Sequence, residues 1–97
     1  MGDIGGLMFV IERGQTMRNL SELAVIIDRE CNTKPWYVYA KPYVQAMYSL
    51  ESINDNYVAD SGESVVRYAL SNLTYWRGDV ARQVKAELKD HLKGVKV

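Results

Sequence analysis

The sequence predicts an all-α domain: a small bundle of three main helices with a Pro/aromatic-rich connecting segment and a short N-terminal arm or strand. Apolar residues recur at intervals of three and four along several stretches, and capping residues precede three of these stretches. The chain has 97 residues, 47% of them hydrophobic and 25% charged, which fits one globular domain with a single core. We therefore expect residues 15–97 to form one helical domain and residues 1–14 to form a flexible arm or a short strand.

The N-terminal arm carries the longest apolar run of the chain, residues 7–11, between glycine-containing flanks. Five residues are too few for a helix but suit an edge strand or an arm that lies against another surface, and a poorly ordered leader is the alternative. The same run is too short to span a bilayer or to form the core of a secretion signal. We therefore expect a cytoplasmic protein with no membrane partner.

The first helix is expected from Asn19 to Cys31. Asn19 followed by Glu22 has the form of an N-terminal cap, in which the Asn side chain accepts a bond from a free backbone N–H. The apolar stripe consists of Leu20, Leu23, Ala24, Ile27 and Cys31. At the end of this stripe, Cys31 is expected to be a small buried apolar residue, and a reactive thiol is the alternative.

The connecting segment, residues 34–43, holds two prolines and four aromatic residues. Proline suits the first turn of a helix, so a second helix is expected to begin near Pro42. The expected face of that helix is Tyr43, Ala46, Met47 and Leu50, with Ile53 just beyond. Residues 54–56 are expected to form a turn.

The third helix is expected to begin after Asp60, which serves as its cap, and the Glu63 side chain is expected to reach back to that cap. Gly78 is expected to end the helix. Its core stripe is predicted to be Val66, Ala69, Leu70 and Leu73, with Val65 and Trp76 at the edges. Tyr68 and Tyr75 are predicted on the far side. Either a neighbouring helix covers these two tyrosines, or they are exposed and available to an interface.

The last helix is expected from Asp79, as its cap, to Val97, and its residue types separate by face. One side carries Val80, Ala81, Val84, Leu88, Leu92 and Val95. The opposite side carries Arg82, Lys85, Lys89, Lys93 and Lys96. The formal net charge of the chain is zero, but residues 77–97 hold six Lys or Arg and three acids, while residues 1–76 hold six and nine. The protein is therefore acidic in its body and basic at its end.

Several short motifs spread over residues 35–93. In chain order they are Pro35-Trp36-Tyr37-Val38-Tyr39-Ala40-Lys41-Pro42-Tyr43, Ala46-Met47, Asp60-Ser61, Ser64-Val65-Val66, Trp76-Arg77-Gly78, Ala81-Arg82, Lys85 and Glu87-Leu88. With these motifs the chain resembles a set of small uncharacterised proteins found in phages and prophages. The resemblance implies a viral context, in which small single-domain proteins often bind and disable a host factor or a defence system. It supplies no catalytic or ligand-binding residues.

The sequence lacks the patterns typical of an enzyme: a nucleophile beside a base, paired carboxylates, a metal cluster or a phosphate-binding loop. A single cysteine, Cys31, and a single histidine, His91, cannot by themselves form a structural zinc site. His91 lies near the edge of the apolar stripe, beside Leu88 and Leu92, where packing is the expected role. We therefore predict a protein that is not an enzyme, with no catalytic residues, no metal and no cofactor.

The aromatic content favours a protein-binding function, because Tyr and Trp contribute much of the binding energy in interfaces. The candidate interface residues are Trp36, Tyr37, Tyr39, Tyr68 and Tyr75. The prediction is a phage-type protein that binds a host protein, as a host-takeover or anti-defence inhibitor. We also expect a homo-oligomer, because the apolar arm, the tyrosines and a small core leave apolar surface to cover.

The alternative function is nucleic-acid binding through the basic face of the last helix, defined by Arg82, Lys85, Lys89, Lys93 and Lys96. Five cations along one helix face could follow a line of phosphates. However, the chain is neutral as a whole and contains no known DNA- or RNA-binding motif. A lysine-rich outer face is most often simply solvated, so nucleic acid ranks second.

Overall fold

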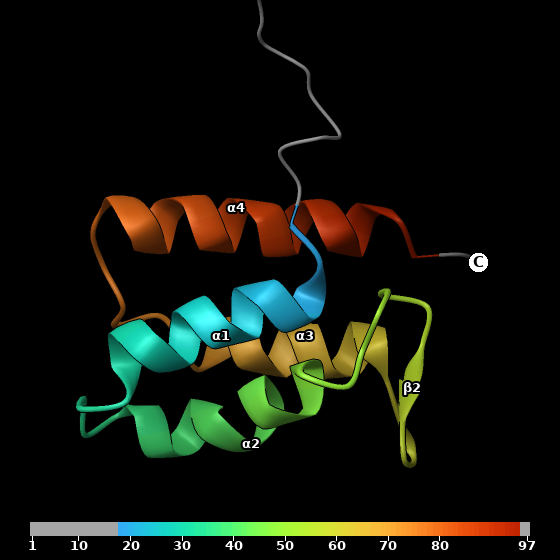
Figure 1. Ribbon diagram of the computed structural model, residues 1–97, viewed down its shortest axis with the longest axis horizontal. Coiled ribbons are helices and arrows are strands. Elements are labelled where there is room, and N and C mark those ends of the chain that lie inside the picture. The colour runs from blue at the N-terminus through green and yellow to red at the C-terminus, as the bar shows by residue number, and fades with distance from the viewer. Residues whose placement is uncertain (1–17, 96–97) are drawn as a thin grey trace, which may run out of the picture.

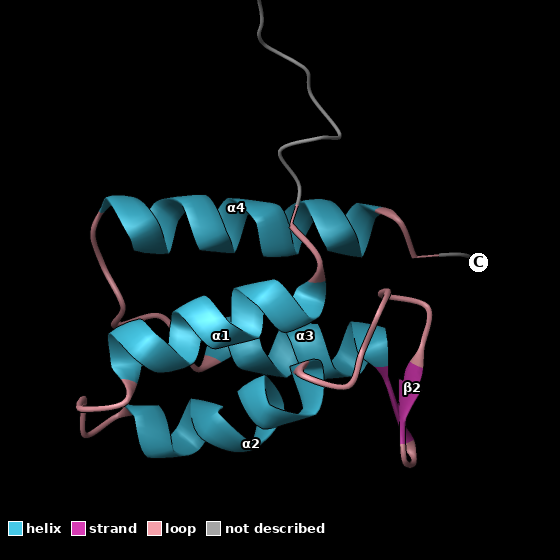
Figure 2. Ribbon diagram, viewed as in Figure 1, coloured by secondary structure: helices cyan, strands magenta, loops and turns pink. Residues whose placement is uncertain are grey.

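The computed structural model describes residues 18–95, which form four helices and one short hairpin (Figures 1 and 2). The elements are α1 (Leu20–Cys31), α2 (Tyr37–Met47), β2 (Asn56–Tyr57), β3 (Asp60–Ser61), α3 (Gly62–Ser71) and α4 (Asp79–Lys93). The predicted helical fold is confirmed. The count of three main helices is wrong, because most of the expected connecting segment belongs to α2, which is a full helix. A two-stranded sheet, which was not predicted, precedes α3. The predicted arm, residues 1–14, lies outside the described residues.

The four helices pack in a closed ring around one core, with α1 against α2 and α4, and α3 against the same two helices. In Figure 1, α1 lies in front of α3, and α4 and α2 flank this pair on opposite sides. Apolar side chains from all four helices and from the loops form one buried cluster. Leu73, Val84 and Leu88 are fully buried as predicted, whereas Leu70 is half-buried.

The first helix confirms its local sequence signals. The Asn19 side chain accepts a hydrogen bond from the Glu22 backbone N–H at 2.8 Å, and the Glu22 carboxylate accepts one from the Asn19 N–H at 3.0 Å. This reciprocal pair satisfies two N–H groups that a helix start would otherwise leave free. All five residues of the predicted apolar stripe are fully buried.

The second helix begins at Tyr37, five residues before the predicted start at Pro42, which lies inside the helix. Pro42 has no N–H for the carbonyl of Val38, but both residues are exposed, so water can reach that carbonyl. The first turn closes through backbone hydrogen bonds, in which the Tyr37 N–H donates to the Lys34 carbonyl and the Tyr39 N–H donates to the Trp36 carbonyl. The helix starts early because Tyr37, Ala40 and Val44 are buried together on one face, which outweighs the first-turn preference of proline.

The third helix begins one residue later than predicted and ends earlier. Ser61, not Asp60, is the cap, and its hydroxyl accepts a bond from the Ser64 N–H at 3.1 Å. Asp60 instead pairs with Tyr57 in the β2–β3 hairpin. The helix ends at Ser71, and Trp76, which was expected at a helix edge, is buried from the loop that follows.

The turn of the hairpin places a valine in an unfavourable conformation. Val58 has a φ of +55° and its side chain is 90% exposed. A β-branched residue is strained in this region, and Asn tolerates it far better. Val58→Asn loses no packing, so we expect it to raise the free energy of unfolding by about 1 kcal/mol in chemical denaturation. The matched control is Ala59→Asn, because Ala59 has no positive φ; an equal gain from both variants would contradict the prediction.

The last helix starts after a glycine whose backbone conformation other residues rarely adopt. Gly78 is the N-cap with a φ of +111°, so Asp79, predicted as the cap, is the first helical residue instead. Ala81, Val84 and Leu88 are buried. Val80 was placed on the same apolar side but is 41% exposed, because it lies at the margin of the contact with the rest of the domain.

Candidate functional site

Five aromatic side chains lie on one side of α2 and at its start, on α3 and in the loop after α3, and we call this set the aromatic row. Its members are Trp36, Tyr39, Tyr43, Tyr68 and Tyr75. The rings of Tyr43 and Tyr68 are stacked, with centroids 5.2 Å apart and planes at 28°. Trp36 and Tyr75 line one surface hollow together. Tyr43 lies beside Tyr68, whereas Trp36, earlier in the chain than Tyr43, lies beside Tyr75, later than Tyr68. The two segments therefore run antiparallel, which brings these rings together in pairs.

Most of the row faces solvent. Tyr39 lies one helical turn from Trp36 and from Tyr43, on the same side of α2. Tyr39 is 69% exposed, Tyr68 54% and Tyr75 72%, while Trp36 and Tyr43 are half-buried. Among residues 18–95, α2 covers Tyr68 only in part, through the Tyr43 ring, and Tyr75 stays largely exposed. The large exposed rings make this row the leading candidate for a protein interface.

Tyr37, a candidate interface residue, lies in the core, so its assignment to a protein interface is wrong. Its side chain is only 3% exposed and belongs to the core. The Tyr37 hydroxyl donates to the Asp28 carboxylate at 2.9 Å, which ties α2 to α1. Burial raises the pKa of Tyr37, and the bond to Asp28 raises it further. Tyr37 therefore holds the fold together and cannot contact a partner.

The predicted basic face of α4 is interrupted. Arg82, Lys89 and Lys93 are exposed, and Lys96 lies outside the described residues. Arg82 pairs with Asp79, and the Lys93 ammonium lies 3.4 Å from the Asp90 carboxylate. The Lys85 side chain is half-buried instead, and its ammonium donates to the Trp76 backbone carbonyl at 2.7 Å. These contacts reduce the positive charge that this face could present to a line of phosphates.

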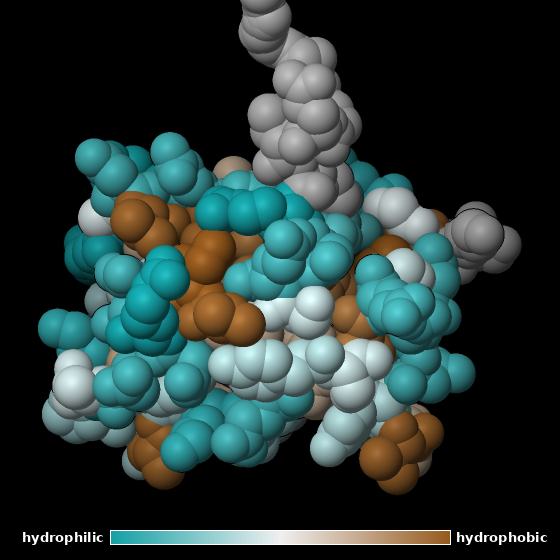
Figure 3. Space-filling model, viewed as in Figure 1, coloured by the Kyte–Doolittle hydropathy of each residue, from teal (hydrophilic) through white to brown (hydrophobic). Residues whose placement is uncertain are grey.

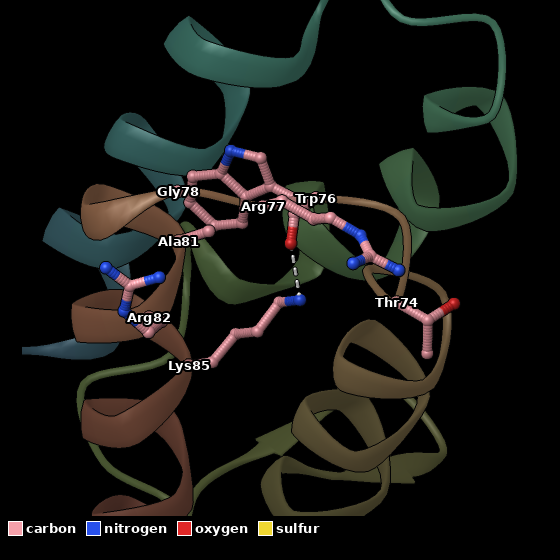
Figure 4. Close-up of a pocket in the computed structure, with 7 residues that line it drawn as sticks. All are labelled: Thr74, Trp76, Arg77, Gly78, Ala81, Arg82 and Lys85. Carbon is pink, nitrogen blue, oxygen red and sulfur yellow. Dashed lines mark hydrogen bonds between the residues drawn. The ribbon is translucent and has the colours of Figure 1, made fainter.

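Two adjoining hollows lie at the corner between α3 and α4, at one end of the aromatic row. The cationic hollow, of about 320 Å³, is lined by Thr74, Trp76, Arg77, Gly78, Ala81, Arg82 and Lys85 (Figure 4). The aromatic hollow, of about 370 Å³, is lined by Glu30, Lys34, Trp36, Tyr75, Trp76 and Arg77. Trp76 and Arg77 belong to both. The sequence predicts a helix end at Gly78 and a helix start at Asp79, but it carries no signal that Lys34 would lie beside this corner.

The cationic hollow brings like charges together. Figure 4 shows the Arg77 and Lys85 side chains near the Trp76 carbonyl, with Arg82 pointing away from them. Burial lowers the pKa of Lys85, and the positive charges of Arg77 and Lys89 lower it further. Within residues 18–95, no carboxylate forms an ion pair with Arg77 or Lys85. This hollow can therefore stabilise an anion.

The only cysteine, Cys31, is fully buried, in agreement with its predicted packing role. Burial is the main cause that raises the pKa of its thiol to about 12. A thiol this weakly acidic forms about a thousandfold less thiolate than an unperturbed one at pH 8. We therefore expect iodoacetamide to modify the native protein at least that much more slowly than the denatured protein, as followed by mass spectrometry. Equal rates in the two states would contradict this placement.

A separate polar cluster anchors the start of α1 to α4. The Arg18 guanidinium bonds both oxygens of the Glu87 carboxylate, at 3.1 and 2.7 Å. His91 Nε2 lies 2.7 Å from the Arg18 carbonyl oxygen. The only histidine of the chain thus makes a structural polar contact, and its predicted packing against the apolar stripe stays a prediction. Sequence reasoning could not find this cluster, because Arg18 and Glu87 are 69 residues apart.

An apolar patch covers part of the surface formed by α1 and α4 (Figure 3). Figure 3 shows it over α1 and the beginning of α4. The exposed apolar side chains of these two helices include Val25 and Val80, and Ile26 is half-buried. Such a patch is a candidate contact surface for a second copy of the chain.

Over residues 18–95 there is no group of three or more His, Cys, Asp or Glu side chains that could hold a metal ion. None of the four described helices combines the length and the apolar character needed to cross a bilayer. Comparisons of the chain with protein-family models, with curated proteins and with solved structures find no significant match.

Proposed function

We propose that this is a non-catalytic protein that acts by binding another protein through the aromatic row. The observation that carries the proposal is the exposure of Tyr39, Tyr68 and Tyr75 in this row. The Tyr68 ring stacks on Tyr43, but more than half of its surface, and still more of Tyr39 and Tyr75, stays open to a partner. A tyrosine brings a large apolar ring and a hydroxyl to an interface and loses little side-chain entropy, so a row of them supports tight contact with a partner.

The motif resemblance to phage and prophage proteins supports a host protein as the partner and the bacterial cytoplasm as the place of action. A small phage protein that binds a host component acts by occupying its surface, as in host takeover or inhibition of a defence system. The row suits such a role, because the Tyr43–Tyr68 stack fixes the rings of two helices before any partner arrives. A preformed surface loses less free energy to ordering when it binds.

Affinity capture with matched variants tests the proposal. The full chain is used as bait in a bacterial lysate, beside a variant with Tyr39→Ser, Tyr68→Ser and Tyr75→Ser. The control is Tyr57→Ser, which changes an exposed tyrosine on the β2–β3 hairpin, outside the row. We expect wild type and the control to enrich the same protein and the triple variant to lose it. Enrichment by the triple variant at wild-type level would reject the row as the interface.

Self-association stays a prediction, and the apolar patch gives it a location. A second copy that covers Val25, Ile26 and Val80 would remove this surface from water. We expect sedimentation at tens of micromolar to show a dimer or a larger species, and Val80→Asp to reduce it. A wild-type monomer under these conditions would contradict the prediction.

A further inference from the structure

The two hollows at the α3–α4 corner differ in chemistry in the way that the two halves of a nucleotide differ. One presents cations and the other presents aromatic rings, and Trp76 and Arg77 line both. We propose that this double hollow binds a nucleoside phosphate, with the phosphate in the cationic hollow and the base in the aromatic hollow.

The cationic hollow supplies the groups that a phosphate requires. Arg77 offers a planar fork of donors, and Lys85 has two further N–H donors beside the one used by the Trp76 carbonyl. The Thr74 hydroxyl lines the same space. An anion here would relieve the repulsion between the two cations, which have no carboxylate partner among residues 18–95. Arg82 contributes less, because Asp79 already pairs with it.

The aromatic hollow supplies the surface that a base requires. The Tyr75 ring is 72% exposed and Trp36 is half-buried, so both rings are accessible from this hollow. Stacking on such rings contributes about 1–3 kcal/mol per base. Glu30 and Lys34 also line it and can accept from or donate to the edge of a base.

A nucleoside phosphate fits the pair of hollows better than an acidic peptide does. A carboxylate side chain would satisfy Arg77 and Lys85 but would leave Trp36 and Tyr75 without a flat partner. Each hollow is near the lower end of the size range for small-molecule sites, and the two together are within that range. The base half of this site shares Trp36 and Tyr75 with the aromatic row. The phosphate half does not, because Arg77 and Lys85 lie outside the row, so variants at these two residues test the nucleotide site without testing the protein interface.

The test uses amide chemical shifts of the isotope-labelled full chain during separate titrations with AMP, adenosine and inorganic phosphate. We expect saturable shifts around both hollows with AMP, and an affinity about tenfold or more above that of either fragment. Arg77→Gln and Lys85→Gln should each weaken AMP about tenfold. Lys85→Gln keeps a donor for the Trp76 carbonyl, and Arg77 is exposed, so both variants should fold. Tyr75→Ser should remove the advantage of AMP over inorganic phosphate.

The matched control is Lys89→Gln, an exposed cation on the next turn of α4 that lines neither hollow. It should weaken AMP much less than Arg77→Gln does, because Lys89 acts on the hollow only through its charge and makes no contact there. The proposal is rejected if AMP binds no better than phosphate, or if Lys89→Gln weakens it as much as Arg77→Gln does. Tighter binding of a single-stranded oligonucleotide without a terminal phosphate, growing with its length and falling steeply with salt, would also reject it and make a nucleic-acid strand the ligand.

Discussion

Truncation of Leu88 or Leu73 to alanine is expected to lower the free energy of unfolding by about 2–5 kcal/mol. Both side chains are fully buried in the common core. Each truncation removes apolar contacts from a close-packed interior and leaves a cavity that its neighbours fill only in part. For a domain of this size the loss is a large share of its total stability, so the midpoint of thermal or chemical unfolding should fall clearly.

The control for this prediction is Val80→Ala, on the same helix as Leu88. Val80 is 41% exposed, and alanine is the better helix former, so the change should stay within about 0.5 kcal/mol of wild type. If Leu88→Ala and Val80→Ala had the same effect, the assignment of the buried face of α4 would be incorrect.

Replacement of Gly62 by alanine is expected to cost about 1–3 kcal/mol, although it adds only one methyl group. Gly62 is buried at the start of α3, and its N–H donates to the Asp55 carbonyl at 2.7 Å. A Cβ at this position would lie 2.6 Å from the Ile53 carbonyl oxygen and 2.9 Å from that of Asp55. Both contacts are with backbone atoms, which no side-chain rotation can relieve, so α3 or the preceding loop must shift.

The comparison variant is Gly94→Ala, at the C-terminal cap of α4. Its Cβ would lie 3.3 Å from the His91 carbonyl oxygen, and its φ is negative, so a small adjustment suffices. We expect a lower melting temperature for Gly62→Ala, by about 4–8 °C for each kcal/mol lost, and a much smaller change for Gly94→Ala. Equal melting temperatures for the two variants would show that the loop before α3 yields easily.

The sequence by itself determined those features that depend on residues close together in the chain. The start of α1 follows from Asn19 and Glu22, which bond each other across one turn, and its buried stripe follows from the helical period. Cys31 was placed correctly for the same reason. Local signals were weaker where two residues compete for one role, as with Asp60 and Ser61 before α3. Pro42 misled because proline is tolerated inside a helix when the carbonyl it leaves free can reach water.

Only the tertiary structure decided which side chains meet. The aromatic row requires α2 and the α3 segment to run antiparallel, so that Tyr43 stacks on Tyr68 and Trp36 shares a hollow with Tyr75. Tyr37 has the same chemistry but points into the core, a difference set by the direction in which α2 docks. The cations of the double hollow come from the loops before α2 and after α3 and from α4. Burial and proximity between distant segments are properties of packing, and a one-dimensional pattern records them only for neighbours along the chain.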